Sequence, residues 1–97
     1  VTGCRIRDTV KIVEKGSTVS STADRSKYWM VQTPQAFPCS MLRKAYAAVE
    51  AEKKEVFDDS QAVEIVGETV KICETDKPNI KITTPEDLQV AAAILKL

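Results

Sequence analysis

Histidine is absent from this 97-residue sequence. Its absence excludes Ser-His-Asp and Cys-His nucleophile systems, and also zinc sites with imidazole ligands. Any chemistry must therefore use lysine, arginine, carboxylates, hydroxyls or backbone groups. Glycine is scarce as well: Gly3, Gly16 and Gly67 form no Gly-x-Gly-x-x-Gly or Walker-type loop, so the sequence shows no loop that would cradle a nucleotide's phosphates.

The sequence also lacks an excess of charge and a long apolar run. Its 14 basic and 14 acidic residues give a formal net charge of zero, which argues against nucleic acid or a membrane surface as a partner. No apolar run approaches the roughly 20 residues of a membrane-spanning helix, and no signal peptide is recognisable. Because the sequence begins at Val1 rather than methionine, we expect that upstream sequence is missing.

Cysteine is present but not in pairs. Cys4, Cys39 and Cys73 are odd in number and form no Cys-x-x-Cys motif, so we expect reduced, mostly buried thiols rather than a disulfide framework. The apolar fraction of 43% allows a real core. The length suits one small domain or a piece of a larger one.

Strand-like and helix-like patterns alternate along the chain, which predicts an α/β fold with parallel strands. Residues 8–14 and 18–22 are polar, strand-like segments on either side of a turn at Gly16, and they form either an edge hairpin or an arm that needs a partner chain. The later elements are a buried strand over 28–33, helices over 40–53 and 58–66, strands over 69–74 and 79–83, and a helix over 85–97.

The helix over 40–53 should supply much of the core. We expect Ser40 to cap it, and apolar residues recur on one face at helical spacing. That face consists of Leu42, Ala45, Tyr46 and Val49.

The junction between the strand over 79–83 and the last helix is the most informative segment. Thr84 occupies an N-cap position, Pro85 the first helical position and Asp87 the third, which together are typical of a helix start. Parallel α/β sheets bind ligands beyond the carboxyl ends of their strands. Lys81 therefore lies where a phosphate would bind.

Other polar residues at strand ends or in the ribbon could contribute to the same site. Arginine can hold a phosphate through two parallel hydrogen bonds, and lysine acts more as a point charge. The alternative for Arg25 is a surface ion pair with Asp24 or a nearby glutamate, and for the acidic pair Asp58 and Asp59 we prefer compensation of the helix dipole. The candidates are Asp8, Thr9, Lys11, Asp24, Arg25, Thr33, Gln35 and Lys81.

Four motifs occur in one order along the chain. They are Asp-Thr-Val-Lys at 8–11, Asp24-Arg25 followed by Trp29, Gln-Thr-Pro-Gln-Ala-Phe at 32–37, and Asn-Ile-Lys-Ile-Thr-Thr-Pro-Glu-Asp-Leu at 79–88. With these motifs the sequence resembles the C-terminal part of the 2-C-methyl-D-erythritol 4-phosphate cytidylyltransferase family. The resemblance covers nearly all 97 residues.

The resemblance implies an enzyme of the non-mevalonate isoprenoid pathway that transfers CMP from CTP to methylerythritol phosphate and releases pyrophosphate, with Mg²⁺. It implies a Rossmann-like α/β nucleotidyltransferase fold of the nucleotide-diphospho-sugar transferase type, and a homodimer formed through a protruding β-arm. Residues 8–27 would be that arm and residues 28–97 the remainder of the sheet and helices. A bacterial cytoplasm, or a plastid in a plant, would be the compartment.

By the same resemblance, Thr9 and Arg25 contact a sugar phosphate bound mainly by the other subunit, and Thr33 and Lys81 contact it from the nucleotide's own subunit. Arg25 and Lys81 would hold the attacking phosphate in line with the α-phosphorus of CTP. The Gly-rich CTP loop and an acidic segment belong to the N-terminal half of the family and are missing here. We therefore expect no metal ligand in this chain, Mg²⁺ bound mainly through CTP and the missing half, and no activity from the 97 residues alone.

Two alternatives remain open. A related cytidylyltransferase that acts on ribitol 5-phosphate shares the Thr-Pro-Gln and Asn-Ile-Lys elements, and the Asp-Thr-Val-Lys motif favours methylerythritol phosphate. A non-catalytic dimerisation module is the other, and the missing glycine loop favours it for the chain as it stands.

Overall fold

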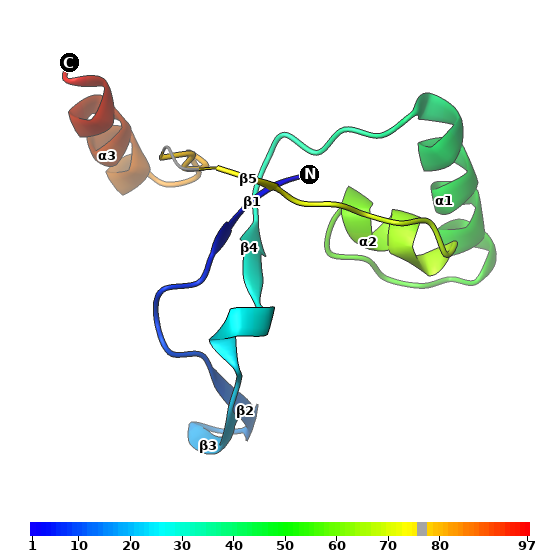
Figure 1. Cartoon of the computed structure of the whole chain (residues 1–97), viewed down its shortest axis with the longest axis horizontal. Coiled ribbons are helices and arrows are strands. Elements are labelled where there is room, and N and C mark those ends of the chain that lie inside the picture. The colour runs from blue at the N-terminus through cyan, green and yellow to red at the C-terminus, as the bar shows by residue number, and fades with distance from the viewer. Residues whose placement is uncertain (76–77) are drawn as a thin grey trace.

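A short mixed sheet joins the parts of the chain in a computed structural model that describes residues 1–75 and 78–97. Strand β1 (Thr2–Arg5) lies in its centre, antiparallel to β4 (Trp29–Val31) and parallel to β5 (Cys73–Glu74). Figure 1 shows the three strands together, between the hairpin and the helices. The sequence patterns missed β1 and predicted β4 and β5 too long.

Gly3 allows this sheet to pack closely. It pairs with Val31 on one side and Glu74 on the other. A Cβ atom at Gly3 would lie 2.8 Å from Cγ2 of Ile72 and 3.0 Å from the carbonyl oxygen of Met30. Both distances are shorter than ordinary contacts, so the centre of the sheet has no room for a side chain.

A two-stranded hairpin projects from the sheet. It consists of β2 (Lys11–Lys15) and β3 (Thr18–Thr22), which pair antiparallel around Gly16 at a φ of 62°. This confirms the predicted turn, because a positive φ is a conformation that glycine adopts without strain. Every residue of both strands is exposed, and Figure 1 shows the hairpin extending away from the helices.

Two helices form the buried core. Helix α1 (Cys39–Ala51) packs on α2 (Asp59–Ile65), and the buried apolar residues among those described are Ala45, Val49, Ala62 and Val63. The prediction that Ser40 caps α1 is wrong: Pro38 precedes the helix and no side chain caps it. The predicted stripe is only partly core, because Leu42 is half-buried and Tyr46 is 40% exposed.

Helix α3 (Pro85–Leu95) begins as the sequence predicts. The Thr84 hydroxyl accepts a hydrogen bond from the amide of Asp87, whose carboxylate in turn accepts one from the amide of Thr84. Hydrogen bonds from the backbone of Thr83 and Thr84, and from their hydroxyls, lower the pKa of Asp87 to about 2. No residue of α3 is buried, and Figure 1 shows the helix apart from the others.

Two further predictions need correction. The predicted strand over 79–83 is wrong: these residues form no sheet pairing with the described part of the chain. The strand over 28–33 is not buried, because Tyr28, Met30 and Val31 are 40–54% exposed. The cysteines are free, as predicted, but two of the three are exposed and the third is half-buried.

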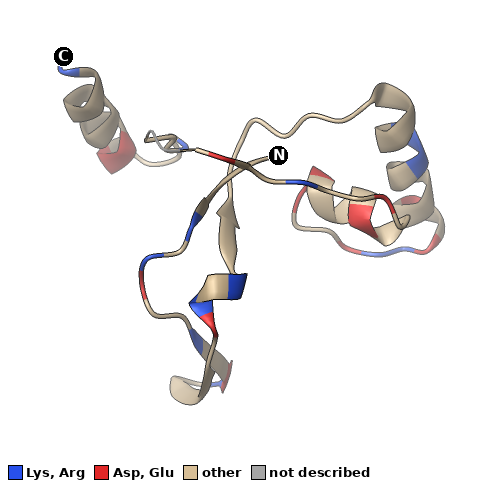
Figure 2. Ribbon diagram, viewed as in Figure 1, with Lys and Arg blue, Asp and Glu red and all other residues tan. Residues whose placement is uncertain are grey.

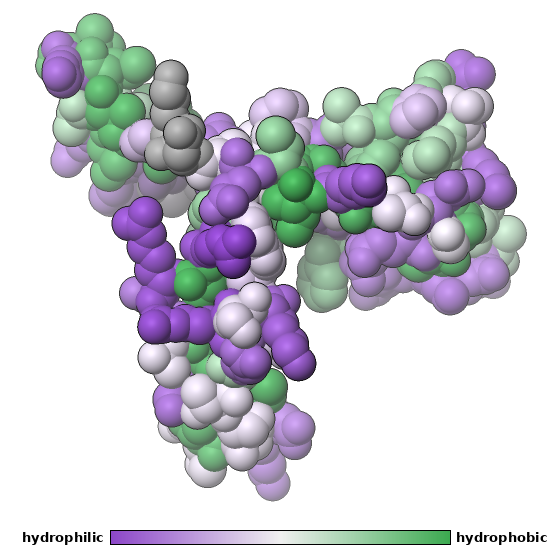
Figure 3. Space-filling view, viewed as in Figure 1, coloured by the Kyte–Doolittle hydropathy of each residue, from purple (hydrophilic) through white to green (hydrophobic). Residues whose placement is uncertain are grey.

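The chain is extended for its length. Its radius of gyration is 16.6 Å, where a compact chain of this length has about 13 Å. Its accessible surface is 7950 Å², where a compact protein of this mass exposes about 5500 Å². Figure 3 shows apolar surface over α3 and the hairpin, including Val13, Val19, Leu88 and Leu95 at 46–66% exposure. These surfaces are available to other protein segments.

No helix among the described residues has the length and apolar character to cross a membrane.

Candidate phosphate-binding site

A cavity of about 1490 Å³ lies between the sheet, the short helix η1 (Arg25–Lys27) and the segment that precedes α3. Three of the four residues predicted to bind substrate line it: Arg25, Thr33 and Lys81. Asp8 and Gln35 line it as well, whereas Thr9 is exposed and is not among the lining residues. The structure therefore gathers residues from both ends of the chain on one cavity.

Cations outnumber carboxylates by one in the cavity lining: four basic residues stand against Asp8, Asp58 and Glu74. Arg5 is engaged elsewhere: it forms an ion pair with Glu74 at 3.4 Å and lies over the Trp29 ring at 4.6 Å. The other lining cations are Arg7, Arg25 and Lys81, and no carboxylate of the described residues lies within 4 Å of them. Figure 2 shows the basic residues around the hairpin base and η1. Such a lining suits an anionic ligand.

Arg25 is fixed at the base of the hairpin. Its Nη1 donates a hydrogen bond to the carbonyl oxygen of Arg7 at 2.5 Å. The alternative of an ion pair with Asp24 is not observed, because the Asp24 carboxylate accepts hydrogen bonds from the amide and hydroxyl of Ser26. Those bonds lower the pKa of Asp24. The rest of the Arg25 guanidinium remains available to a ligand.

Lys81 and Thr33 are connected through an amide. Asn79 Nδ2 donates to the carbonyl oxygen of Thr33 at 2.7 Å and lies 3.4 Å from Oε1 of Gln32. Gln32 Oε1 also accepts from the hydroxyl of Thr75 at 3.0 Å. The segment that carries Lys81 is thus attached to the turn that carries Thr33.

Gln35 has a structural role that the sequence patterns did not show. Its Oε1 accepts from the amide of Ser60 at 3.1 Å and its Nε2 donates to Asp58 at 3.0 Å. Burial raises the pKa of Asp58, but hydrogen bonds from Gln61, Gln35 and Ser60 outweigh it and lower that pKa. Asp58 also caps α2, in line with the preferred helix-end interpretation. Gln35 therefore joins the start of α2 to the Thr33 turn.

The remaining candidates lie in the hairpin or outside the cavity. Lys11 Nζ donates to the Thr22 hydroxyl at 2.8 Å, across the two strands.

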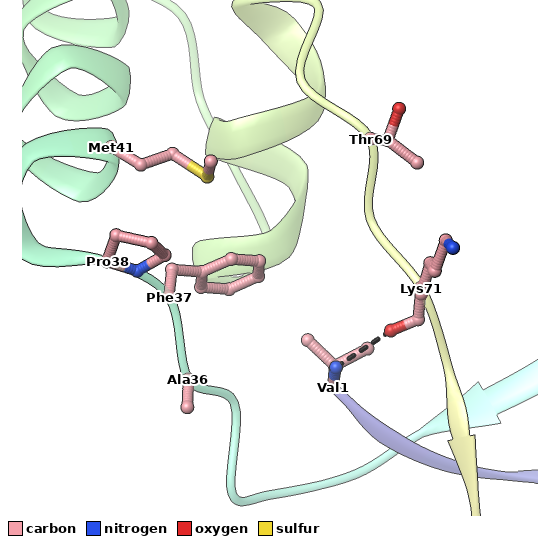
Figure 4. A pocket seen from close by; sticks show the side chains of 7 residues that line it. All are labelled: Val1, Ala36, Phe37, Pro38, Met41, Thr69 and Lys71. Atoms are coloured by element: carbon pink, nitrogen blue, oxygen red, sulfur yellow. Dashed lines mark hydrogen bonds between the residues drawn. The ribbon is translucent and has the colours of Figure 1, made fainter.

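A second cavity of about 340 Å³, drawn in Figure 4, is mostly apolar and includes Phe37, Met41 and Lys71. Lys71 is its one charged side chain, and none of the residues predicted to bind substrate lines it.

Sequence patterns missed Asn79, Gln32 and Thr75 as site residues. Asn79 belonged to a predicted strand, and its partners are more than 40 residues away in the sequence. An amide at the start of an otherwise apolar segment was the only local signal.

The described residues hold no group of three or more His, Cys, Asp or Glu that could bind a metal ion, so they offer no complete ligand set for Mg²⁺.

Known proteins resemble the whole chain. A family model described as 2-C-methyl-D-erythritol 4-phosphate cytidylyltransferase matches residues 1–97. Proteins of that name from Geobacillus kaustophilus and Nostoc punctiforme are 48% and 38% identical over 91 and 95 residues. These alignments cover 94% and 98% of this chain but 40% and 42% of the relatives. The chain thus spans about two fifths of their length.

A solved structure has the same fold. The crystal structure of 4-diphosphocytidyl-2C-methyl-D-erythritol synthase from Anaerococcus prevotii superposes with a TM-score of 0.84 at 37% identity. The match covers 100% of this chain and 45% of that protein. The chain therefore has part of the α/β nucleotidyltransferase fold.

Proposed function

This chain belongs to the 2-C-methyl-D-erythritol 4-phosphate cytidylyltransferase family, and on that premise we propose that it supplies sugar-phosphate binding and dimerisation to such an enzyme. The whole enzyme transfers CMP from CTP to 2-C-methyl-D-erythritol 4-phosphate and releases pyrophosphate, in the non-mevalonate isoprenoid pathway. The family match over residues 1–97 is the observation that carries the proposal. The unpaired cations around the large cavity support it.

The reaction needs positioning and charge stabilisation from these residues. An oxygen of the substrate's phosphate attacks the α-phosphorus of CTP, and the bond from that phosphorus to the β-phosphate's bridging oxygen breaks. Arg25 and Lys81 hold the attacking phosphate in line and offset charge in the transition state. The hydroxyls of Thr9 and Thr33 add directional hydrogen bonds.

We propose that each site takes Thr9 and Arg25 from one subunit and Thr33 and Lys81 from the other. The fully exposed hairpin is the dimerisation arm, because its strands bury nothing on their own and an isolated two-stranded hairpin is marginally stable. Within one chain Arg25 lines the same cavity as Thr33 and Lys81, and in the dimer we propose that the arm places Arg25 of one subunit at the Lys81 of the other. The cavity of about 1490 Å³ exceeds the roughly 300–1000 Å³ of typical ligand pockets, which leaves room for an element of a second subunit.

CTP and Mg²⁺ are proposed to bind mainly to parts of the enzyme outside these 97 residues. When bound, Mg²⁺ would neutralise charge on the CTP phosphates. The 97-residue chain alone is therefore expected to be inactive. The proposed compartment is a bacterial cytoplasm, or a plastid if the source is a plant.

The test is a substrate comparison with the full-length enzyme. Pyrophosphate release from CTP is measured with methylerythritol phosphate and, separately, with ribitol 5-phosphate. We expect turnover with the first and at least about 100-fold lower kcat/KM with the second, since a site built around one substrate's hydroxyls rejects a mismatched polyol. A higher kcat/KM with ribitol 5-phosphate would mean that ribitol 5-phosphate, and not methylerythritol phosphate, is the substrate. Turnover of neither compound would favour the alternative of a non-catalytic dimerisation module.

A further inference from the structure

Among the described residues, one side chain makes the hydrogen bonds that link the segment carrying Lys81 to other segments. Residues 78–82 form no sheet pairing within the described part of the chain. Among the described residues, their hydrogen bonds to other segments are the two that the Asn79 amide donates. Asn79 lies two residues before Lys81, so these bonds are close to the lysine in the chain.

The acceptors of that amide are fixed. The carbonyl of Thr33 can only accept, so the Asn79 atom 2.7 Å from it must be the NH₂ nitrogen. The second acceptor, Gln32 Oε1, also accepts a hydrogen bond from the Thr75 hydroxyl at 3.0 Å. The backbone N–H of Gln32 donates to the carbonyl oxygen of Thr2 at 2.8 Å. The Asn79 amide is thus attached to the turn that directly follows β4, where Gln32 is still hydrogen-bonded to the sheet.

We propose that Asn79 is the positioning residue for Lys81: its amide, bound to the Thr33 carbonyl, sets the Lys81 ammonium opposite the Thr33 side of the cavity. Asn79, Thr33 and Lys81 all line that cavity. The inference rests on the proposed function, in which Lys81 binds the substrate's phosphate. Asn79 itself touches neither the phosphate nor the reacting atoms.

The expected effect of Asn79→Ala follows from this geometry. Without the amide, the segment loses its hydrogen bonds to the sheet and Lys81 moves. A misplacement of about 1 Å costs on the order of 100-fold in rate, so we expect kcat/KM for the sugar phosphate to fall by roughly 10- to 100-fold. The KM for CTP should stay within about twofold, because the nucleotide is bound elsewhere.

A double-mutant cycle in the full-length enzyme tests the inference. Asn79→Ala and Lys81→Ala are made singly and together, and kcat/KM for the sugar phosphate is measured for each. If Asn79 acts through Lys81, Asn79→Ala costs less than about twofold in the Lys81→Ala background, because no ammonium remains to be positioned. Equal losses in both backgrounds would mean a general structural role and would overturn the inference.

Two further variants complete the design. Asn79→Asp keeps the side chain's size but places a carboxylate against the Thr33 carbonyl, so its loss should match that of Asn79→Ala. Tyr46→Phe is the control: it removes the hydrogen bond that the Tyr46 hydroxyl donates to the Asp59 carboxylate, and neither residue lines the cavity, so kcat/KM should change by less than about twofold in either background. Activity of Asn79→Asp near that of the wild type would contradict the inference.

The outcomes separate this inference from the proposed function. If Lys81→Ala itself leaves kcat/KM unchanged, the assignment of the phosphate site fails and the inference with it. If Lys81→Ala is severely impaired and Asn79→Ala is not, or adds its full loss to that of Lys81→Ala, only the inference fails.

Discussion

Two inactive variants of the full-length enzyme should restore each other's activity if every site takes Arg25 from one subunit and Lys81 from the other. Each variant alone, Arg25→Ala or Lys81→Ala, loses one cation from the substrate's phosphate. Hydrogen bonds to charged groups contribute about 1.5–3 kcal/mol, which corresponds to roughly 10- to 150-fold in kcat/KM. Each homodimer should therefore keep at most about a tenth of wild-type activity at subsaturating sugar phosphate.

The mixed dimer contains one site with both substitutions and one site with neither. Random pairing of equal amounts makes about half of the dimers mixed, so about a quarter of all sites are intact. The two variants are co-expressed with different tags or exchanged by dilution and concentration, and pyrophosphate release is compared with the wild type. We expect about a quarter of wild-type activity, against a tenth or less for either variant alone.

Co-purification of the two tags shows that the subunits have exchanged, and a matched mixture controls for any effect of mixing itself. Arg43 is an exposed arginine of α1, outside the cavity, and Arg43→Ala is expected to be active. Mixed with Lys81→Ala, it should give about half of wild-type activity whichever way the sites are built. Half activity in that control and co-purified tags, with no gain from mixing Arg25→Ala and Lys81→Ala, would refute the shared site and place both cations in one subunit.

Three other predictions concern the fold that supports the site, each measured on the full-length enzyme. Gly3→Ala should destabilise by about 1–3 kcal/mol, since its Cβ would lie 2.8 Å from Ile72; a melting temperature equal to the wild type would contradict this. The pKa of Asp87, about 2 when folded, lies below its unfolded value of about 3.9, so its stabilising contribution is present above about pH 4 and lost as the pH falls toward 2. Asp87→Asn should flatten this part of the stability profile, and an unchanged acid slope would argue against the capping box. Val13→Asp, in the exposed hairpin, should shift the sedimentation equilibrium from dimer to monomer by at least tenfold in Kd, whereas an unaltered dimer would exclude the hairpin from the interface.

Local signals in the sequence predicted the elements that depend on neighbouring residues. The Gly16 turn, the helix start at Asp58 and Asp59, and the capping box of Thr84 and Asp87 all occur in the structure. In each case the partner lies within three residues, so a single stretch of sequence contains the whole interaction. The same stretch cannot indicate how a segment pairs over long distances.

The errors lie where pairing is not local. Strand β1 shows no clear alternation of apolar and polar residues. It forms because β4 and β5, which lie far along the chain, pair with it on either side of Gly3. The segment over 79–83 has the alternation of a strand but no partner among the described residues, because β propensity reflects packing against neighbours. Lys81 was predicted as a site residue, yet the hydrogen bond from Asn79 to Thr33 was not, since 46 residues separate Asn79 from Thr33.

Direct binding of the sugar phosphate tests the central claim, that the cavity of Lys81 holds the substrate's phosphate. The Kd of the full-length enzyme for 2-C-methyl-D-erythritol 4-phosphate is measured by calorimetry for the wild type, Lys81→Ala and Lys44→Ala, whose lysine pairs with Glu68 on the helical part of the chain. The account predicts a Kd raised roughly 10- to 150-fold by Lys81→Ala and changed by less than about twofold by Lys44→Ala. Equal Kd values for Lys81→Ala and the wild type would contradict it.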